Sequence, residues 1–187
     1  MNIGILSFHG DCSEHITATE QAGKNLGLKI SIVPVRTKKE LHGLDGLIIP
    51  GGESPTLRKL CERENMWEEM KKVKNIFGTC AGAILLEKMK LMDIKVDRNA
   101  YGRQIDSFEK TIKTKLGEVN AVFIRAPKIK SIGKNVSILS KNENEIVACE
   151  QKTNGRFYLA TCFHPELTTT KFHEYFLKSL KSASLRL

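Results

Sequence analysis

The chain has 187 residues, of which 41% are hydrophobic, and its formal net charge is +9. This length favours one domain over residues 1–187 with a sizeable core, and this composition excludes a disordered or low-complexity protein. Lysine and arginine are spread along the chain without a zinc-finger spacing, an RNA-binding signature or a basic helix, which favours a basic surface or a dock for an acidic protein over nucleic-acid binding.

Strands and helices alternate through the first half of the chain. Compact apolar runs predict buried strands, and helical patterns lie between them. We expect strands over residues 2–8, 29–35, 45–49 and 75–77, and helices over 11–26, 56–61, 66–74 and 81–89. Asp11 and Glu14 resemble a capping box at the start of the first helix. This alternation predicts a three-layer α/β fold, in which a mostly parallel central sheet has helices on both faces.

Strand patterns dominate the second half of the chain. We expect strands over residues 119–124, 136–139, 145–150 and 156–163. Polar turn residues at 142–144 and 153–155 predict hairpins within this group. A last helix is predicted over about 169–180, and no repeat or linker divides the chain.

No feature of the sequence predicts secretion or a membrane location. The N-terminal stretch MNIGILSFHG lacks the basic start, the long apolar middle and the cleavage site of a signal peptide. No apolar run approaches the roughly 20 residues of a membrane helix. Five scattered cysteines, an odd number, suit reduced thiols better than a disulfide framework. We therefore expect a cytoplasmic protein with no membrane partner.

The stretch NIFGTCAGAIL, residues 75–85, places a cysteine between two glycines where a strand is expected to meet a helix. Gly78-Thr79-Cys80-Ala81-Gly82 fits the nucleophile-elbow pattern G-x-S-x-G with sulfur in place of the hydroxyl. In such a turn the amide of Ala81 can point at an oxyanion, and the positive end of the helix favours a thiolate. We predict Cys80 as a nucleophile, with an ordinary buried cysteine as the common alternative.

A cysteine nucleophile needs a histidine base, and the base needs a group that orients it. Five histidines are candidates, and His164 stands out because it ends an apolar strand and precedes Pro165 and Glu166. In an extended segment, residues two apart project to the same side, so Glu166 can accept a hydrogen bond from the imidazole. We predict His164 as the base and Glu166 as its orienting group, the alternative being a histidine that caps the loop before the last helix.

Two further stretches predict contacts to a substrate. Backbone amides of the loop Pro50-Gly51-Gly52-Glu53-Ser54 can bind a substrate carboxylate or complete an oxyanion hole, which we assign to Gly52 and Ala81. The alternative is a tight turn in which Glu53 and Ser54 are helix caps only. Arg98 lies in a polar stretch, where single arginines are usually solvated, but Arg125 ends an apolar strand and can clamp a carboxylate bidentately.

Metal and nucleotide sites are not predicted. Cys162 and His164 alternate, but no C-x-x-C pair accompanies them, so a zinc site is not expected. The sequence has neither a Walker A motif nor a G-x-G-x-x-G motif, so nucleotide binding has no support. We therefore expect no metal and no cofactor.

Taken together, these stretches resemble the class I (triad) glutamine amidotransferases, and within them the family of glutaminase subunits of pyridoxal 5′-phosphate synthase (PdxT/SNO). The motifs occur in family order: PGGES at 50–54, GTCAG at 78–82, DRNAYGRQIDSFE at 97–109, FIRAP at 123–127 and FHPEL at 163–167. The elbow and FHPE mark the wider superfamily, whereas RNxYGRQxxSFE with FIRAP is specific to this branch. The resemblance implies a flavodoxin-like α/β fold.

The resemblance also implies a reaction and a partner. A triad of Cys80, His164 and Glu166 would hydrolyse L-glutamine to glutamate and ammonia through a thioester. Ammonia would pass to a synthase subunit that builds pyridoxal 5′-phosphate from a pentose phosphate and a triose phosphate. The glutaminase would be weak alone and activated by docking on that subunit in a large mixed complex. The implied glutamine contacts, with Gly51 in the same loop, are Gly52, Glu53, Ser54, Arg98, Ile124 and Arg125.

This chain departs from the family pattern in three places. His9 precedes Gly10 where the family usually has Gln, which can alter activation and makes His9 a rival for the base. Pro55 follows GGES, where a proline in the first helical turn is tolerated. The connection before Arg98 is short, which affects a surface segment rather than the site.

Two other functions stay open. The first is a stand-alone cysteine hydrolase on the same fold, such as a γ-glutamyl hydrolase, which would be active without any partner. The 97–109 motif argues against it. The second is a non-catalytic binding or thiol-sensing protein, which would be inert toward glutamine even with a partner. The intact set of Cys80, His164 and Glu166 argues against that function.

Overall fold

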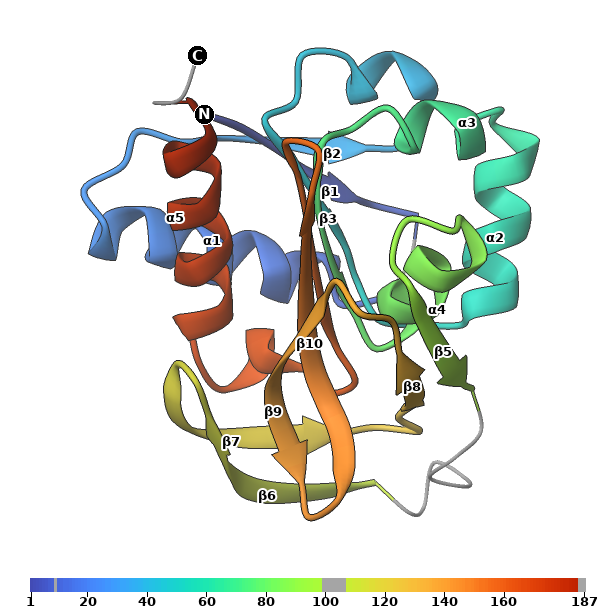
Figure 1. Ribbon diagram of the computed structural model, residues 1–187. Helices are drawn as coiled ribbons and strands as arrows, with labels where there is room; N and C mark the ends of the chain where they lie inside the picture. Colours follow the sequence, from blue (N-terminus) through green and yellow to red (C-terminus); the bar gives the residue numbers. More distant parts are fainter. Residues whose placement is uncertain (9, 99–106, 185–187) are drawn as a thin grey trace.

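The computed structural model describes residues 1–8, 10–98 and 107–184. Two features of the sequence therefore lie outside the described residues: His9, and the part of the 97–109 motif that covers 99–106. The described residues form an 11-stranded mixed sheet with helices on both faces (Figure 1). The expected α/β class is confirmed, and the expected parallel strands form one part of a sheet that is mixed as a whole.

The strands fall into a parallel group and an antiparallel group. The parallel group consists of β1 (Asn2–Leu6), β2 (Ser31–Val35), β3 (Gly46–Ile49), β4 (Asn75–Thr79) and β11 (Arg156–Thr161). The antiparallel group consists of β5 (Ile94–Asp97), β6 (Phe108–Thr114), β7 (Gly117–Phe123), β8 (Lys128–Ile132), β9 (Val136–Asn142) and β10 (Glu145–Thr153). The order across the sheet is β2-β1-β3-β4-β11-β10-β9-β6-β7, with β8 paired to β10 and β5 paired to β8.

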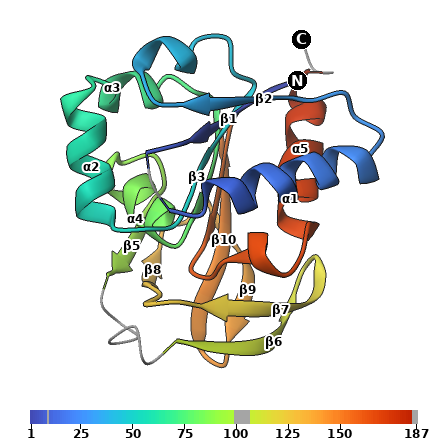
Figure 2. The same ribbon diagram turned by 180° about the vertical axis from the view of Figure 1, so that it is seen from behind.

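Helices cover the parallel group on two sides and produce three layers (Figures 1 and 2). On one face α1 (Cys12–Asn25) packs against α5 (Lys171–Ser184). The other face is covered by α2 (Ser54–Arg63), α3 (Trp67–Met70) and α4 (Ala81–Lys88). Short 3-10 turns are formed by Lys38–Leu41 and Pro165–Leu167. The antiparallel strands extend the sheet beyond the helices, and β6 and β7 cross its far end (Figure 1).

Burial follows the position of each strand in the sheet. Every residue of β3 and β4 is buried, because central parallel strands are covered by helices on both faces. In β7 the buried residues Val119, Ala121 and Phe123 alternate with more exposed ones, because only one face of this outer strand packs on the core. The continuous apolar runs of the first half and the alternating patterns of the second half have this origin.

Aromatic side chains fix the segment that joins β11 to α5. Phe163 lies against Phe123 of β7, with ring centroids 5.7 Å apart, and against Phe172 of α5, at 5.4 Å. All three rings are fully buried. Packed aromatic rings of this kind bury large apolar areas and have few alternative positions. The backbone at residue 164, next to Phe163, is therefore held firmly.

Several sequence-based expectations are corrected by the structure. The strands β5, β6 and β8 were not expected, because alternating lysines in FEKTIKT and KIKSI obscure their strand character. The helix expected over 66–74 is only Trp67–Met70. Asp11 is the N-cap residue of α1, but its side chain makes no capping hydrogen bond, so the predicted capping box is wrong. The two predicted hairpins are confirmed as β9–β10 and β10–β11.

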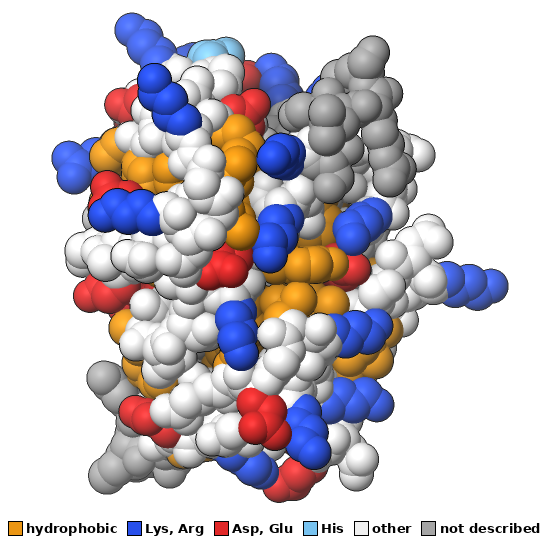
Figure 3. Space-filling model, turned by 90° about the vertical axis from the view of Figure 1, so that its left-hand side faces the viewer, with side chains coloured by type: hydrophobic (Ala, Val, Ile, Leu, Met, Phe, Trp, Pro, Cys, Tyr) orange, Lys and Arg blue, Asp and Glu red, His pale blue; other side chains and the backbone are white. Residues whose placement is uncertain are grey.

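Basic and acidic side chains are intermixed on the face of the molecule that Figure 3 draws. Figure 3 shows one face on which lysines and arginines lie apart from one another, with acidic side chains between them. This agrees with the even spread of basic residues along the sequence. Within the described ranges, none of the helices has the length and apolarity that crossing a bilayer requires.

Candidate active site

The turn between β4 and α4 holds Cys80 in a strained conformation. Its backbone has φ 49° and ψ −105°, a combination that non-glycine residues rarely adopt. A Cβ on Gly78 would come within 2.5 Å of the backbone of Gly82, and a Cβ on Gly82 would come within 2.2 Å of the carbonyl oxygen of Ile49. Only glycine fits at both positions. The predicted strand–turn–helix junction is confirmed.

The surroundings of Cys80 tie it to both groups of strands. Its amide donates to the carbonyl of Thr161 in β11, at 2.8 Å. Its sulfur lies 3.9 Å from the carbonyl oxygen of Ile124, just past β7. Ala81 is the first residue of α4, so its amide belongs to the unpaired N–H groups of a helix start, which attract negative charge. A thiol at this place can react with an electrophile whose oxygen lies near that amide.

His164 and Glu166 form a buried pair. The Nδ1 atom of His164 lies 2.8 Å from Oε1 of Glu166. Only 3% of His164 and 9% of Glu166 is exposed. The predicted pairing is confirmed, but its predicted cause is wrong, because Pro165–Leu167 forms a 3-10 turn and not an extended segment. The turn of the backbone at Pro165 brings the two side chains together.

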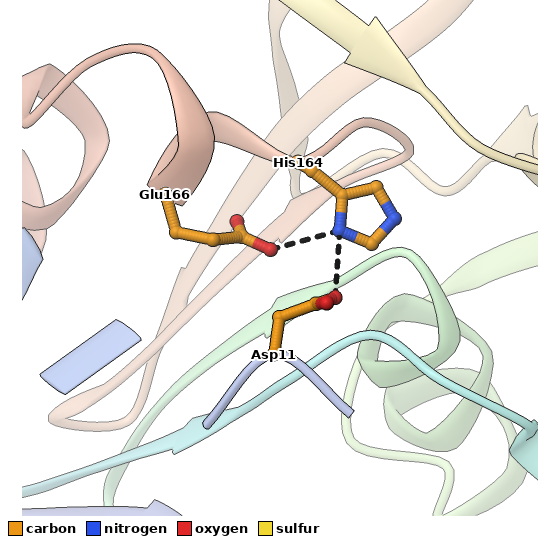
Figure 4. A group of neighbouring side chains, drawn as sticks. All are labelled: Asp11, His164 and Glu166. Carbon is orange, nitrogen blue, oxygen red and sulfur yellow. Dashed lines mark hydrogen bonds and ion pairs between the residues drawn. The ribbon is translucent and has the colours of Figure 1, made fainter. Parts of the chain in front are cut away.

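Asp11 is a second carboxylate on the same imidazole and was not among the predicted site residues. Its Oδ2 lies 3.0 Å from Nδ1 of His164, and both carboxylates approach this one nitrogen (Figure 4). The other ring nitrogen points away from them (Figure 4). Asp11 follows Gly10 just past the end of β1, and the rule that ligands gather at the carboxyl ends of parallel strands could have identified it.

Cys80 and His164 line the same cavity, and the thiol is close enough to the imidazole to raise its pKa. Since Nδ1 faces the two carboxylates, Nε2 is left for the thiol. Burial alone would lower the pKa of His164, but the hydrogen bonds to Asp11, Cys80 and Glu166 outweigh it and raise the pKa well above its usual range. The imidazolium form is therefore favoured, as a thiolate partner requires.

Glu166 is kept ionised by its neighbours. Burial of the side chain would raise the pKa of this carboxyl, but the rings of His15 and His164 hold it well below its usual range. An ionised carboxylate accepts the Nδ1 proton of His164 and leaves Nε2 able to exchange a proton with sulfur. The arrangement of thiol, imidazole and carboxylate is suited to acyl transfer through a covalent intermediate.

A cavity of about 630 Å³ opens over Cys80. It is lined by residues from both groups of strands and the loops between them: Gly10, Asp11, Gly52, Glu53, Ser54, Cys80, Ala81, Ile84, Arg98, Ile124, Arg125, Pro127 and His164. Of the predicted contact residues, Gly51 is not in this lining. It lies behind the His164 ring, where a Cβ would come within 2.4 Å of Cε1. The loops after β1, β3 and β4 therefore converge on one cavity, as is general where parallel strands end at one edge of a sheet.

Glu53 and two arginines meet at the mouth of this cavity. Arg125 Nη2 lies 2.5 Å from Oε1 of Glu53, and Arg98 Nη2 lies 3.6 Å from Oε2. About half of each side chain is exposed. Glu53 is the N-cap residue of α2 but makes no side-chain capping hydrogen bond, so the alternative of a simple helix cap is not what the structure contains. Charges of both signs at one mouth can bind a small zwitterion.

The other cysteines lie away from this cavity. Burial raises the pKa of the Cys61 and Cys149 thiols to about 12, and it raises the pKa of Cys162 well above its usual value. The pKa of Cys12 is also raised by burial. Such thiols stay protonated and unreactive. Cys80 differs from these four cysteines by its position in the cavity lining and its contact with a histidine.

The remaining histidines do not reach the thiol within the described residues. His15 and His173 are fully buried and contact each other, and His42 is exposed on the surface. His9, the rival base in the sequence, lies outside the described residues. Asp11, His164 and Glu166 could hold a metal ion by proximity, but both carboxylates approach a nitrogen that donates a hydrogen bond to them.

Comparison with known proteins gives consistent matches over almost the whole chain. The model of the SNO glutamine amidotransferase family matches residues 5–182. The chain is 45% identical to the pyridoxal 5′-phosphate synthase subunit PdxT of Oenococcus oeni, covering 97% of each chain. It is 44% identical to the subunit of the same name from Brevibacillus brevis, covering 97% of this chain and 98% of the relative.

A solved structure described as a glutamine amidotransferase has a similar fold. It superposes with a TM-score of 0.81 at 37% sequence identity, covering 96% of this chain and 98% of the other. The architecture described above is therefore shared with a known enzyme structure over nearly the full length.

Proposed function

The chain belongs to the SNO glutamine amidotransferase family, and we propose that Cys80, His164 and Glu166 carry out its glutaminase reaction. The observation that carries this proposal is the contact chain from sulfur through one imidazole to a buried carboxylate, at the base of a cavity with a charged mouth. No other cysteine in the described residues combines a histidine contact with access to this cavity.

The protein is the glutaminase subunit of a pyridoxal 5′-phosphate synthase, because it belongs to a glutamine amidotransferase family and its relatives over nearly the full length are named as subunit PdxT of that synthase. Its substrate is L-glutamine, and its partner is a synthase subunit. We propose that the two subunits form a large mixed complex in which ammonia passes from the cavity to the synthase. We also propose one glutamine amidotransferase domain over residues 1–187, supported by the continuous sheet, and a cytoplasmic location, supported by the five free cysteines.

In the first half of the reaction, the Cys80 thiolate attacks the side-chain amide carbon of glutamine. The new S–C bond forms as the carbonyl electrons move onto oxygen, and the amides of Gly52 and Ala81 stabilise this oxyanion. His164, which has taken the thiol proton, then gives a proton to the amide nitrogen. The C–N bond breaks, ammonia leaves, and a glutamyl thioester remains on sulfur.

In the second half of the reaction, water enters and attacks the thioester. His164 removes a proton from this water while Glu166 holds the imidazole in the correct orientation. The C–S bond breaks, glutamate leaves, and the proton returns to the thiolate–imidazole pair. The buried, ionised carboxylate of Glu166 supports both halves, because the imidazole must become positively charged in each.

The mouth of the cavity supports recognition of the amino-acid end of glutamine. Arg98 and Arg125 would bind the α-carboxylate, and Glu53 would bind the α-ammonium group. In the free chain these side chains pair with one another, so the substrate would exchange an exposed ion pair for its own. Ser54 and the backbone at Ile124 line the same cavity and would complete the contacts.

The experiment that tests this function is glutamate release from glutamine, with and without the cognate synthase subunit, for wild type, Cys80→Ala and Cys12→Ser. We expect strong stimulation by the partner, a loss on the order of 10⁴-fold in Cys80→Ala, and near wild-type rates in Cys12→Ser. Cys12 is the matched control because its half-buried thiol lies outside the cavity lining.

Each outcome of this experiment has a distinct meaning. Equal glutamate release without the synthase would indicate a stand-alone hydrolase. No release in either condition would indicate a binding protein with an intact triad, and His9→Gln would then test whether the unusual first loop prevents activation. Full activity of Cys80→Ala would overturn the assignment of the nucleophile.

A further inference from the structure

A buried polar cluster lies directly behind Glu166 and has no part in the reaction described so far. It consists of His15 on α1, Thr79 at the end of β4 and His173 on α5, each with no exposed surface. His15 is its centre: Nδ1 lies 2.9 Å from Nε2 of His173, and Nε2 lies 3.0 Å from Oγ1 of Thr79. The same Nε2 atom lies 3.4 Å from Oε1 of Glu166.

The environment of His173 fixes the direction of these hydrogen bonds. Burial lowers the pKa of His173 to about 3, so its ring is neutral and carries one proton. Its Nδ1 atom has no partner within the described residues. An unpaired buried N–H is costly, so the proton belongs on Nε2, which donates to Nδ1 of His15. Because Nδ1 of His15 accepts this hydrogen bond, the ring carries a proton on Nε2, facing Thr79 and Glu166.

Glu166 makes its contacts through one oxygen only. Oε1 accepts from Nδ1 of His164 and faces Nε2 of His15, whereas Oε2 has no partner in the described part of the chain. The orientation of the carboxylate therefore depends on the two histidines that flank Oε1. One of them, His164, gains and loses a proton during the reaction, whereas His15 takes no part in the proton transfers, so His15 can act as a fixed support.

We propose that His15 is a positioning residue, which holds the Glu166 carboxylate through its Nε2–H and is itself held in one tautomer by His173. This inference rests on the proposed function, because it extends the triad from the same carboxylate. Thr79 adds a second constraint, since it precedes Cys80 and links the position of His15 to the nucleophile turn. An N–H donor at this place favours the ionised carboxylate, in agreement with the lowered pKa of Glu166.

Glutamine and methionine provide a matched pair of substitutions at residue 15. Both have nearly the shape and length of the histidine side chain, but only glutamine can place an N–H where Nε2 now lies. Glutamate release is measured for His15→Gln and His15→Met in the presence of the synthase subunit. We expect His15→Met to lower kcat about tenfold or more with KM within about twofold, and His15→Gln to retain kcat within about threefold.

Two readouts distinguish positioning from a purely structural role. The ¹⁵N–¹H signal of Nδ1 in the His164 ring reports its hydrogen bond to Glu166, and we expect this hydrogen bond to be weakened in His15→Met and kept in His15→Gln. The alkylation rate of Cys80 by iodoacetamide reports the thiolate in the free chain, and we expect it to fall in His15→Met and recover in His15→Gln. Equal kinetics for the two variants, or an unchanged Nδ1–H signal of His164 in His15→Met, would overturn the proposal.

Residue 173 supplies a second pair if the variants at residue 15 do not fold. His173→Gln keeps an N–H toward Nδ1 of His15 and His173→Met does not, so we expect the same order of kcat. Failure of this inference can be told apart from failure of the proposed function. A wild-type chain that releases no glutamate with the synthase subunit contradicts the function, whereas an active wild type with equal variants contradicts the role of His15 alone.

Discussion

The buried triad and the exposed mouth of the same cavity are built in opposite ways. The side chains of His164 and Glu166 are 4% and 0% exposed, whereas those of Glu53, Arg98 and Arg125 are 45–49% exposed. The triad is positioned by a strained turn, packed aromatic rings and buried hydrogen bonds, and the mouth by ion pairs that water reaches. The difference indicates which part must stay fixed and which must exchange partners.

The strength of each kind of contact explains this division. Exposed ion pairs contribute about 0–1 kcal/mol, so a substrate can replace them at little expense. Buried charged hydrogen bonds are stronger and costly to break, so they keep a geometry through many turnovers. We therefore expect substitutions in the triad to change kcat and substitutions at the mouth to change KM. The predictions below test this separation, beginning with the largest expected effect.

Glu166→Gln should have the largest effect on turnover. The amide keeps the shape of the side chain but removes the charge that orients and stabilises the His164 imidazolium, so kcat should fall on the order of 10³–10⁴-fold. KM should stay close to wild type, because Glu166 is not in the cavity lining. Steady-state glutaminase kinetics with the synthase subunit measure both constants. A change confined to KM would contradict the idea that the triad acts on turnover and the mouth on substrate binding.

Gly82→Ala should destabilise the fold by roughly 3 kcal/mol or more, because the new Cβ would meet the Ile49 carbonyl at 2.2 Å and backbone cannot move aside. Gly155→Ala is the matched control in the antiparallel group. Gly155 has φ +71° but no atom within 4 Å of a Cβ, so only about 1 kcal/mol is expected. Urea unfolding of both variants gives the two values, and similar losses would contradict the idea that the elbow is the more constrained region.

His173 should make stability depend on pH. Its pKa in the folded chain is about 3, below the value of about 6.5 expected in the unfolded chain, so the unfolded state binds a proton that the folded state does not. Between pH 7 and pH 5, the free energy of unfolding of wild type should fall by roughly 2 kcal/mol relative to that of His173→Met.

The other two shifted groups of the site do not confuse this comparison. The raised pKa of His164 adds stability that is present below about pH 6.5 and is lost as pH rises. The lowered pKa of Glu166 adds stability that is lost only as pH falls below about 4.5. Both are shared by wild type and His173→Met, so the difference in unfolding free energy isolates residue 173. Parallel pH curves for the two proteins would contradict the prediction.

Arg125→Met should affect recognition rather than chemistry. Loss of the guanidinium should lower kcat/KM about tenfold, almost entirely through KM. Lys130→Met is the matched control, because Lys130 makes an exposed ion pair with Asp97 and does not line the cavity. It should leave both constants within about twofold. A fall in kcat with unchanged KM in Arg125→Met would mean that the mouth also takes part in the chemical steps.

Asp11→Asn should have the smallest effect. Asp11 is the more exposed of the two carboxylates on His164, because about a third of its side chain reaches water, which screens its charge. Glu166 still accepts the Nδ1 proton, so kcat should fall only about threefold. The ratio of the kcat losses in Asp11→Asn and Glu166→Gln measures how much each carboxylate contributes to the function of the His164 imidazole. Equal losses would contradict this prediction and would mean that Asp11 supports His164 as strongly as Glu166 does.

Much of the site could be predicted from local sequence. The glycines around Cys80 encode a turn that other residues cannot form, and the Phe163–Leu167 motif keeps His164 and Glu166 two residues apart. Parallel strands end at one edge of a sheet, so the loops after β1, β3 and β4 are expected to lie together on topological grounds alone. These features depend on short-range sterics or on general topology, and both can be inferred from a single sequence.

Other features depend on long-range packing that no local pattern contains. Asp11 has the residue type and position of a helix cap, but the proximity of His164 takes its side chain away from α1. His15 and His173 come from the first and last helices and meet only because α1 and α5 pack together. The lysine-rich strands β6 and β8 become strands through pairing with neighbours rather than through their own propensity.

The pairing of β4 with β11 has a consequence during translation. Asn75 lies opposite Phe157 and Thr79 opposite Thr161, so all the antiparallel strands are synthesised between the two partners. Closing so large a loop is slow, and contacts between distant segments form late in folding. A chain still on the ribosome therefore exposes the Cys80 turn before the Thr161 carbonyl and His164 exist, so the nucleophile is made first and becomes reactive last.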